Sequence, residues 1–219
     1  MEPDRVEYLE QTVVAMVTQA LIDYRDEAIT IFCEETDHPQ DIAEDILREA
    51  IDTMGLSEMH ERLYGKVDLK KAIYVFAPEV EPVALMLDAK AEKDDRTATI
   101  QMSQTSMTVN QERSGSSVSV EGGLDSFITR SDRRMLVVTV IAKFVYHENN
   151  GNRALERIMV ACIPNGLLQD RYNPNTEDTI WKAGRNAPTL GEDFRVRLDY
   201  RALKAKAAWR VCDIECVPQ

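Results

Sequence analysis

The chain has 219 residues, of which 44% are hydrophobic, enough for one large domain with a proper core or for two small domains. It has no run of eighteen apolar residues, and its acidic start, Met1-Glu2-Pro3-Asp4, lacks the basic and apolar segments of a secretion signal. We therefore expect no membrane span and no signal peptide. The four cysteines lack the paired spacing of a zinc site, which favours reduced thiols in a cytoplasmic protein.

The net charge of −12 argues at first against a nucleic-acid partner, but the charge is unevenly distributed. Residues 1–62 hold 17 acidic and 4 basic side chains, whereas residues 181–210 hold eight basic and three acidic ones. Because DNA binding depends on local neutralisation of phosphates, the basic segment is a candidate DNA-binding face. A solvated charged face is the ordinary alternative.

Two helices are expected in the acidic part of the chain. Apolar residues recur at helical spacing from Val6 to Phe32, which predicts one long amphipathic helix. A second helix is expected from Gln40 to Met54, with Gly55 placed to end it. Both helices are expected to cover the core or to form a subunit interface.

Two short apolar runs follow, Ile73–Phe76 and Val83–Leu87, and both are typical of buried strands. The loop between them is short enough for an antiparallel hairpin. Asp68 would then lie at the start of the first strand and Asp88 at the end of the second. Antiparallel pairing would bring these two carboxylates together.

Asp88 and Lys90 share one face of an extended strand, whereas Ala89 points to the other. Two carboxylates, from Asp68 and Asp88, could hold Mg²⁺, which binds through hard oxygen ligands and keeps several waters. Lys90 could then orient water for attack on a phosphate. On spacing alone, an Asp-x-Lys pair at a strand end is more often a solvated surface pair.

The rest of the chain is predicted to form strands with few helices, and no linker divides it. We therefore expect a single α/β domain over residues 1–219, with an acidic helical part (1–62) and a core (63–219) built on a mixed central sheet flanked by helices. The expected elements are strands in 101–109 and 116–120 around a turn at 113–116, strands in 135–146 and 153–164 joined by a hairpin, a short helix in 166–172, a loop in 181–188, a strand in 194–199, a helix in 200–208 and a last strand in 210–216.

Arg195 and Arg197 alternate with apolar residues in the strand expected near the C-terminus. Their guanidinium groups therefore project from one side, where they could form paired hydrogen bonds with guanine in the major groove. The alternative is that they form ion pairs with Glu192, Asp193 or Asp199.

The spacing from Asp68 to Asp88-Ala89-Lys90 resembles the motif of the PD-(D/E)xK nuclease superfamily. Within that superfamily, several segments in order resemble the SfiI-like family of type II restriction endonucleases. They are 87–91 (LDAKA), 42–46 (IAEDI), Ser103-Gln104, 171–174 (RYNP), Ala183-Gly184 and 208–210 (AWR).

This resemblance implies a restriction-endonuclease-like core with Asp68, Asp88 and Lys90 as catalytic residues. It also implies Mg²⁺ held by Asp68, Asp88 and the carbonyl of Ala89. Glu44 lies in a matching helical segment and is a candidate for a supporting role behind the metal, with simple surface acidity as the alternative.

The resemblance further implies that Arg195 and Arg197 contact bases and that Arg185 contacts a base or a phosphate. The implied function is Mg²⁺-dependent double-strand cleavage of DNA at an interrupted, G·C-rich palindrome by a homodimer or homotetramer in a prokaryotic cytoplasm. Two alternatives remain open at this point: a repair or junction nuclease of the same superfamily, and a DNA-binding protein without catalytic activity.

Overall fold

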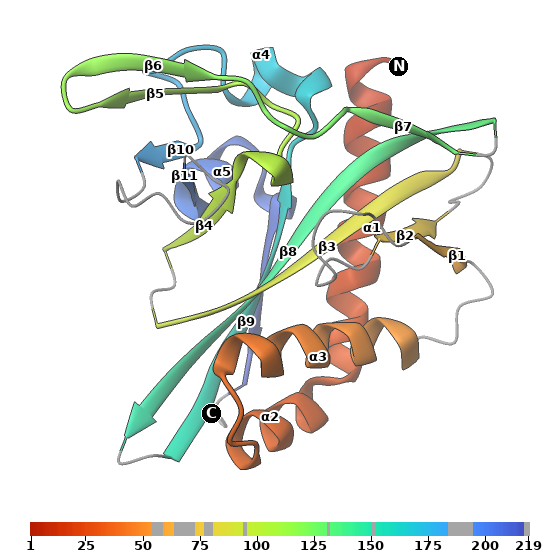
Figure 1. Ribbon diagram of the computed structural model, residues 1–219, viewed down its shortest axis with the longest axis vertical. Coiled ribbons are helices and arrows are strands. Elements are labelled where there is room, and N and C mark those ends of the chain that lie inside the picture. The colour runs from red at the N-terminus through yellow and green to blue at the C-terminus, as the bar shows by residue number, and fades with distance from the viewer. Residues whose placement is uncertain are drawn as a thin grey trace.

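The computed structural model describes residues 1–53, 59–63, 73–76, 81–93, 96–130, 132–149, 152–183 and 195–216 (Figure 1). Only the backbone is described for residues 59–63, 73–76 and 130. The α-helices are α1 (Pro3–Asp23), α2 (Arg25–Glu34), α3 (Pro39–Thr53), α4 (Gln169–Tyr172) and α5 (Tyr200–Lys206), and the 3₁₀ helices are η1 (Met102–Gln104), η2 (Gly166–Leu168) and η3 (Ala208–Arg210). The strands are β1 (Met59–Leu63), β2 (Ile73–Phe76), β3 (Val83–Glu92), β4 (Thr97–Gln101), β5 (Val109–Arg113), β6 (Ser116–Val120), β7 (Phe127–Arg130), β8 (Arg133–Asn149), β9 (Asn152–Ile163), β10 (Trp181–Ala183), β11 (Arg195–Asp199) and β12 (Val211–Glu215).

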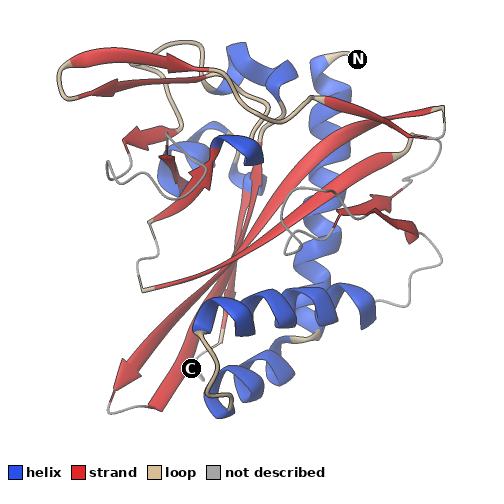
Figure 2. Cartoon of the chain, in the orientation of Figure 1, coloured by secondary structure: helices blue, strands red, loops and turns tan. Residues whose placement is uncertain are grey.

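The central sheet has the strand order β1-β2-β3-β8-β9-β12, and β7 pairs with the start of β8. β3 and β8 run parallel, whereas the other pairs are antiparallel, so the expected mixed sheet is confirmed. The long ribbons of β8 and β9 extend through most of the molecule (Figure 2). Their length follows from dense β-branched and apolar side chains, which favour extended backbone when buried on a sheet.

Successive side chains of β3 point to opposite faces of the central sheet. On one face, Ala89 lies next to α3, and α2 stacks Phe32 on Phe144 of β8 with their ring centroids 6.3 Å apart. This helix-covered face carries most of the main core. The other face, which we call the Asp88 face, carries Asp88, Lys90 and Glu92 of β3. None of the described helices has the length and hydropathy needed to cross a membrane.

Several sequence predictions are confirmed by this topology. The β2–β3 hairpin pairs Ile73 with Met86, and β8 and β9 form the expected long hairpin. α3 and the short helical segment of residues 166–172 also lie where they were expected.

Three predictions about local structure are wrong. The first helix is interrupted at Tyr24 (φ −95°, ψ 8°), so that α2 turns to pack Phe32 against the sheet. The region expected to be a strand over 101–109 contains the last residue of β4, then η1, and the next strand begins at Val109. The expected loop of residues 181–188 begins with strand β10, which forms by pairing with β11.

A second, three-stranded sheet has the order β10-β11-β4 and is antiparallel throughout. Beside it, β5 and β6 form a separate hairpin that projects at the upper left of Figure 1. The hairpin turn places Ser114 and Gly115 at positive φ (53° and 79°), the geometry that favours glycine in two-residue turns. The three-stranded sheet and the β5–β6 hairpin therefore lie on the same side of the molecule.

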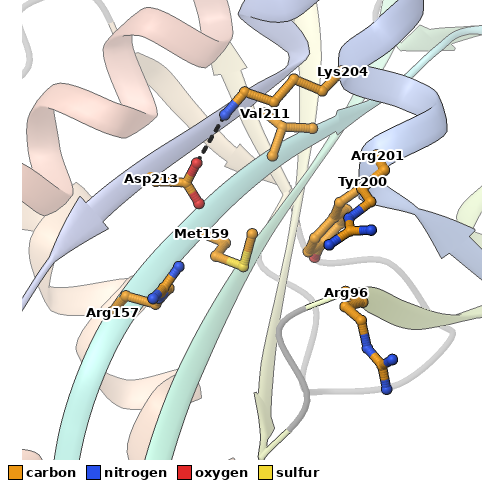
Figure 3. Close-up of a pocket in the computed structure, with 8 residues that line it drawn as sticks. All are labelled: Arg96, Arg157, Met159, Tyr200, Arg201, Lys204, Val211 and Asp213. Carbon is orange, nitrogen blue, oxygen red and sulfur yellow. Dashed lines mark hydrogen bonds and ion pairs between the residues drawn. The ribbon is translucent and has the colours of Figure 1, made fainter.

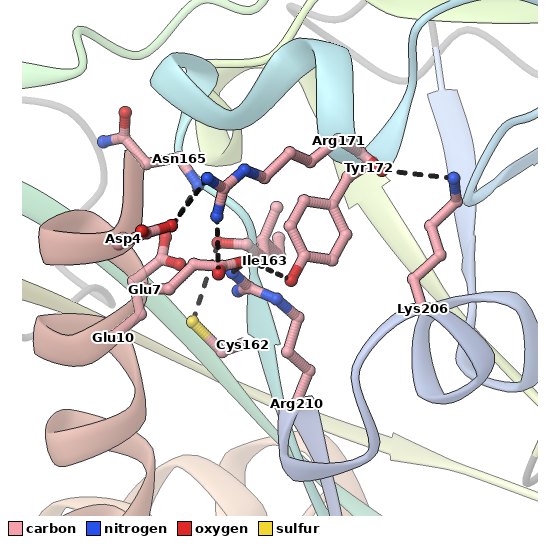
Figure 4. A network of polar contacts seen from close by, with 10 residues as sticks. All are labelled: Asp4, Glu7, Glu10, Cys162, Ile163, Asn165, Arg171, Tyr172, Lys206 and Arg210. Atoms are coloured by element: carbon pink, nitrogen blue, oxygen red, sulfur yellow. Dashed lines mark hydrogen bonds and ion pairs between the residues drawn. The ribbon is translucent and has the colours of Figure 1, made fainter. Parts of the chain in front are cut away.

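A buried ion pair joins the first helix to the C-terminal part of the chain. The Nη2 atom of Arg210 lies 2.6 Å from Oε2 of Glu10, and both side chains are fully buried (Figure 4). Glu10 also accepts a hydrogen bond from the backbone N–H of Asn165, and the guanidinium lies 4.2 Å from the ring centroid of Tyr172. Despite this cation, burial raises the pKa of Glu10. The network fixes α1, the 165–172 segment and η3 relative to one another.

Candidate active site and DNA-binding face

Asp88 and Lys90 lie side by side on the Asp88 face. The Nζ atom of Lys90 is 2.8 Å from Oδ2 of Asp88, and their side chains are 18% and 15% exposed. The contact is an ion pair and not an aligned hydrogen bond, since Oδ2 has no hydrogen-bond partner among the described residues. Both residues lie inside β3 and not at its end as predicted, because β3 continues to Glu92 alongside β8. A mostly buried acid and amine are thus held next to each other on one strand.

The carbonyl of Ala89 faces α3 through a single glutamine. Nε2 of Gln40 donates to the Ala89 oxygen at 2.7 Å, and Oε1 of Gln40 accepts from the N–H of Ala91 at 3.0 Å. The same Nε2 donates to Oε1 of Glu44 at 2.9 Å. The Gln40 amide therefore bonds to the backbone of β3 as a neighbouring strand would. Glu44 contacts this amide, and so it is linked to the Ala89 carbonyl only by way of Gln40.

A buried lysine occupies the neighbouring strand on the Asp88 face. Lys143 of β8 is opposite Lys90 in the parallel register and is fully buried. Its Nζ lies 2.8 Å from Oε2 of Glu92 and also donates to the carbonyl of Thr97. Lys143 thereby neutralises Glu92 and links the end of β3 to the start of β4.

The residues that the structure describes supply oxygen donors of the kind that Mg²⁺ prefers. These donors are the Asp88 carboxylate and the Ala89 carbonyl. The Ala89 oxygen accepts a hydrogen bond from Gln40 with one lone pair, so its other lone pair could bind a cation. No three His, Cys, Asp or Glu side chains of the described ranges cluster as metal ligands. Asp68, the second carboxylate expected here, lies outside the described residues, as does Arg185.

The second sheet presents cations on one face. Val196 and Leu198 of β11 are buried, and Arg195 and Arg197 lie on the alternate positions, as the sequence predicted. Arg197 is paired in register with Lys182 of β10, although like charges directly opposite each other repel. Asp199 forms an ion pair with Lys182 and caps α5, and no ion pair of Arg197 is found among the described residues. Such a face is suited to a polyanion.

Comparison with known proteins identifies the family. A family model of the type II restriction enzyme SfiI matches residues 7–214, nearly the whole chain. The chain belongs to the type II restriction enzyme SfiI family. It is 28% identical over 227 residues to the type II restriction enzyme SfiI of Streptomyces fimbriatus, which covers 96% of this chain and 84% of that enzyme.

Solved structures of two restriction endonucleases agree with this assignment. The crystal structure of tetrameric SfiI bound to cognate DNA matches with a TM-score of 0.86 and 26% identity, over 98% of this chain and 86% of that one. The crystal structure of BglI bound to its DNA recognition sequence shares the fold, with a TM-score of 0.78 and 16% identity over 97% and 91% of the two chains. The predicted fold class and enzyme class are therefore confirmed. A repair nuclease and a DNA-binding protein without activity are disfavoured.

The sequence analysis did not single out two residues that lie around the Asp88–Lys90 pair. Lys143 had a usable signal, because a lone charge inside the apolar run 135–145 must find a partner when the strand is buried. Gln40 had no such signal, since its bonds reach residues about fifty positions away in the chain. Lys182 was counted among the basic residues of 181–210 but was not singled out for the DNA-binding face.

Proposed function

We propose that this SfiI-family enzyme makes Mg²⁺-dependent double-strand cuts in DNA at an interrupted, G·C-rich palindromic site. The observation that supports this most directly is the Asp88–Lys90 pair, whose charged atoms lie 2.8 Å apart and whose side chains are mostly buried. The pair lies in a chain that belongs to a restriction endonuclease family. The relatives' solved structures contain cognate or recognition-sequence DNA, which is the substrate class proposed here.

In the proposed mechanism, Asp88 and Asp68 would hold Mg²⁺ together with the Ala89 carbonyl. When bound, the ion stabilises the charge that develops on the phosphate and lowers the pKa of a bound water. Lys90 orients the attacking water and is itself positioned by Asp88. Gln40 fixes the Ala89 carbonyl, and Glu44 orients the Gln40 amide from behind. The products would carry 5′-phosphate and 3′-hydroxyl ends.

We further propose that the enzyme acts as a homodimer or homotetramer. A palindromic site is matched by two-fold symmetry in the protein, so two copies must face the two half-sites. The SfiI relative is tetrameric, which makes a tetramer the first state to test.

Digestion of a sequenced plasmid tests the function itself. In the presence of Mg²⁺ the purified enzyme is expected to give a small set of reproducible fragments whose ends map to one interrupted palindrome. Removal of the ion with EDTA should stop cleavage. Nicking that follows DNA structure and not sequence would indicate a repair or junction nuclease, and DNA that is bound but never changed would indicate a protein without catalysis.

Replacement of Arg197 by alanine tests base recognition by the second sheet. We expect a loss of about 1–3 kcal/mol in binding, confined to a single base pair of the site, because a paired guanidinium–guanine contact discriminates by that amount. Binding to a panel of singly substituted duplexes measures the loss at each position. A uniform loss on all duplexes would show that Arg197 contacts a phosphate, and the same panel can be applied to Arg195 and Arg185.

A further inference from the structure

A cavity of about 240 Å³ lies on the Asp88 face, outside the site described above. Its floor is formed by β9 and β12, and α5 and the start of β4 form its walls (Figure 3). Four cationic side chains and one carboxylate line it, together with a tyrosine. These residues are Arg96, Arg157, Arg201, Lys204, Asp213 and Tyr200.

The strand register relates this cavity to the proposed active site. Lys90 is opposite Lys143, Lys143 is opposite Met159, and Met159 is opposite Asp213, so that these four side chains form one row across the Asp88 face. Strands in a sheet lie about 4.8 Å apart, which puts Met159 on the cavity floor roughly 10 Å from Lys90. Each DNA strand carries a phosphate about every 3.4 Å of helix axis. Phosphates a few nucleotides from the cut would therefore come within reach of the cavity.

The charges around the cavity favour an anion. Lys204 forms an ion pair with Asp213 at 2.9 Å, and Arg157 forms one with Glu156 at 3.2 Å. The Arg201 guanidinium has no ion pair or hydrogen bond in the part of the chain that the structure describes, and Arg201 comes from α5, as Tyr200 does (Figure 3). An arginine fork matches the oxygen geometry of a phosphate better than a lysine does. Positive charge thus remains available although the N-terminal part of the chain is strongly acidic.

A buried hydroxyl gives a second, independent indication of a ligand. Tyr200 is only 3% exposed, and its phenol oxygen has no hydrogen-bond partner among the described residues. Burial raises the pKa of Tyr200, so the phenol stays neutral and keeps its proton to donate. Buried polar groups nearly always find a partner in native proteins. Because the phenol oxygen is also closed to solvent, a phosphate oxygen would accept this proton only if the side chains around it shift when the phosphate binds.

We propose that this cavity binds a backbone phosphate of the DNA outside the scissile step, through Arg201 and the Tyr200 hydroxyl, in a field strengthened by Arg96 and Arg157. This inference rests on the proposed DNA-cutting function. The contact would help fix the register of the duplex over Asp88 and Lys90 without reading its sequence.

The test compares Arg201→Gln and Tyr200→Phe with Arg25→Gln, an exposed arginine on α2, as a control. Without divalent ions, Arg201→Gln is expected to weaken binding roughly 3- to 10-fold on cognate and unrelated duplexes alike and to reduce the salt slope by about 1. Duplexes with single methylphosphonates locate the contact. One neutralised phosphate near the cut should weaken the wild type but not Arg201→Gln, and Tyr200→Phe should lose part of the same sensitivity.

The bound phosphate could belong to the DNA backbone or be a free anion. Calorimetric titration of inorganic phosphate into the DNA-free protein separates these two possibilities. Phosphate binding that Arg201→Gln abolishes, with DNA binding and the methylphosphonate map unchanged, would overturn the assignment to DNA and leave a site for a free anion. If Arg201→Gln matches Arg25→Gln in every measurement, the proposed site is wrong. Plasmid cleavage by the wild type, run in parallel, tests the proposed nuclease function independently of these binding results.

Discussion

Replacement of Asp88 by asparagine is expected to lower the rate of DNA cleavage by about 10³-fold or more while leaving DNA binding in place. Asparagine keeps the shape of the side chain but removes the charge that is proposed to hold Mg²⁺ and that positions Lys90 at 2.8 Å. Binding should not weaken, because the change removes a negative charge from a surface that faces phosphates. Single-turnover cleavage with Mg²⁺ and equilibrium binding without it measure the two effects separately.

Asp170→Asn provides the matched control, since it removes an exposed carboxyl on α4. This variant should cut at the wild-type rate. If Asp88→Asn cuts equally well, the assignment of Asp88 to the catalytic site is wrong. A variant that loses binding and cleavage together would instead show that Asp88 supports the fold of β3.

Replacement of Arg210 by methionine is expected to destabilise the protein by about 3–5 kcal/mol at neutral pH, because it leaves the fully buried Glu10 carboxylate without its cation. The effect should be smaller in acid. The pKa of Glu10 in the folded protein lies above its ordinary value of 4.5, so its contribution to folding stability is present below that value and is lost as the pH rises through the folded-state pKa. Without Arg210 the pKa of Glu10 rises further, which enlarges this loss. Urea unfolding at pH 5 and pH 8 measures both effects.

The double variant Glu10→Gln/Arg210→Met separates charge from packing. Glutamine can still accept the hydrogen bond from the N–H of Asn165 but carries no charge. The double variant should therefore recover much of the lost stability and show little of the pH dependence. Equal stability of Arg210→Met and the wild type at pH 8 would mean that the ion pair does not stabilise the fold.

The parts of the fold that could be predicted are those whose signal is local. The β8 and β9 hairpin follows from apolar runs around Asn149–Asn152, and α3 follows from regular helical spacing ended near Gly55. The face shared by Asp88 and Lys90 also follows from alternation along a strand. In each of these cases the neighbouring residues alone determine the outcome.

The parts that could not be predicted depend on partners far away in the chain. The three residues of β10 have no strand pattern of their own and become extended only by pairing with β11. Asp88 lies inside β3 because β8, some fifty residues later, pairs with that strand through Glu92. The break at Tyr24 depends on where Phe32 meets Phe144, although the apolar periodicity runs through it without a signal.

The pairing of Glu10 with Arg210 also has a consequence for how the polypeptide is made. The two residues are 200 positions apart, so during synthesis the helix that carries the acid leaves the ribosome 200 residues before the matching cation. Until that moment the acid has no counter-charge with which to enter the apolar interior. We therefore expect a nascent fragment that lacks Arg210 to leave the contacts around Glu10 incomplete.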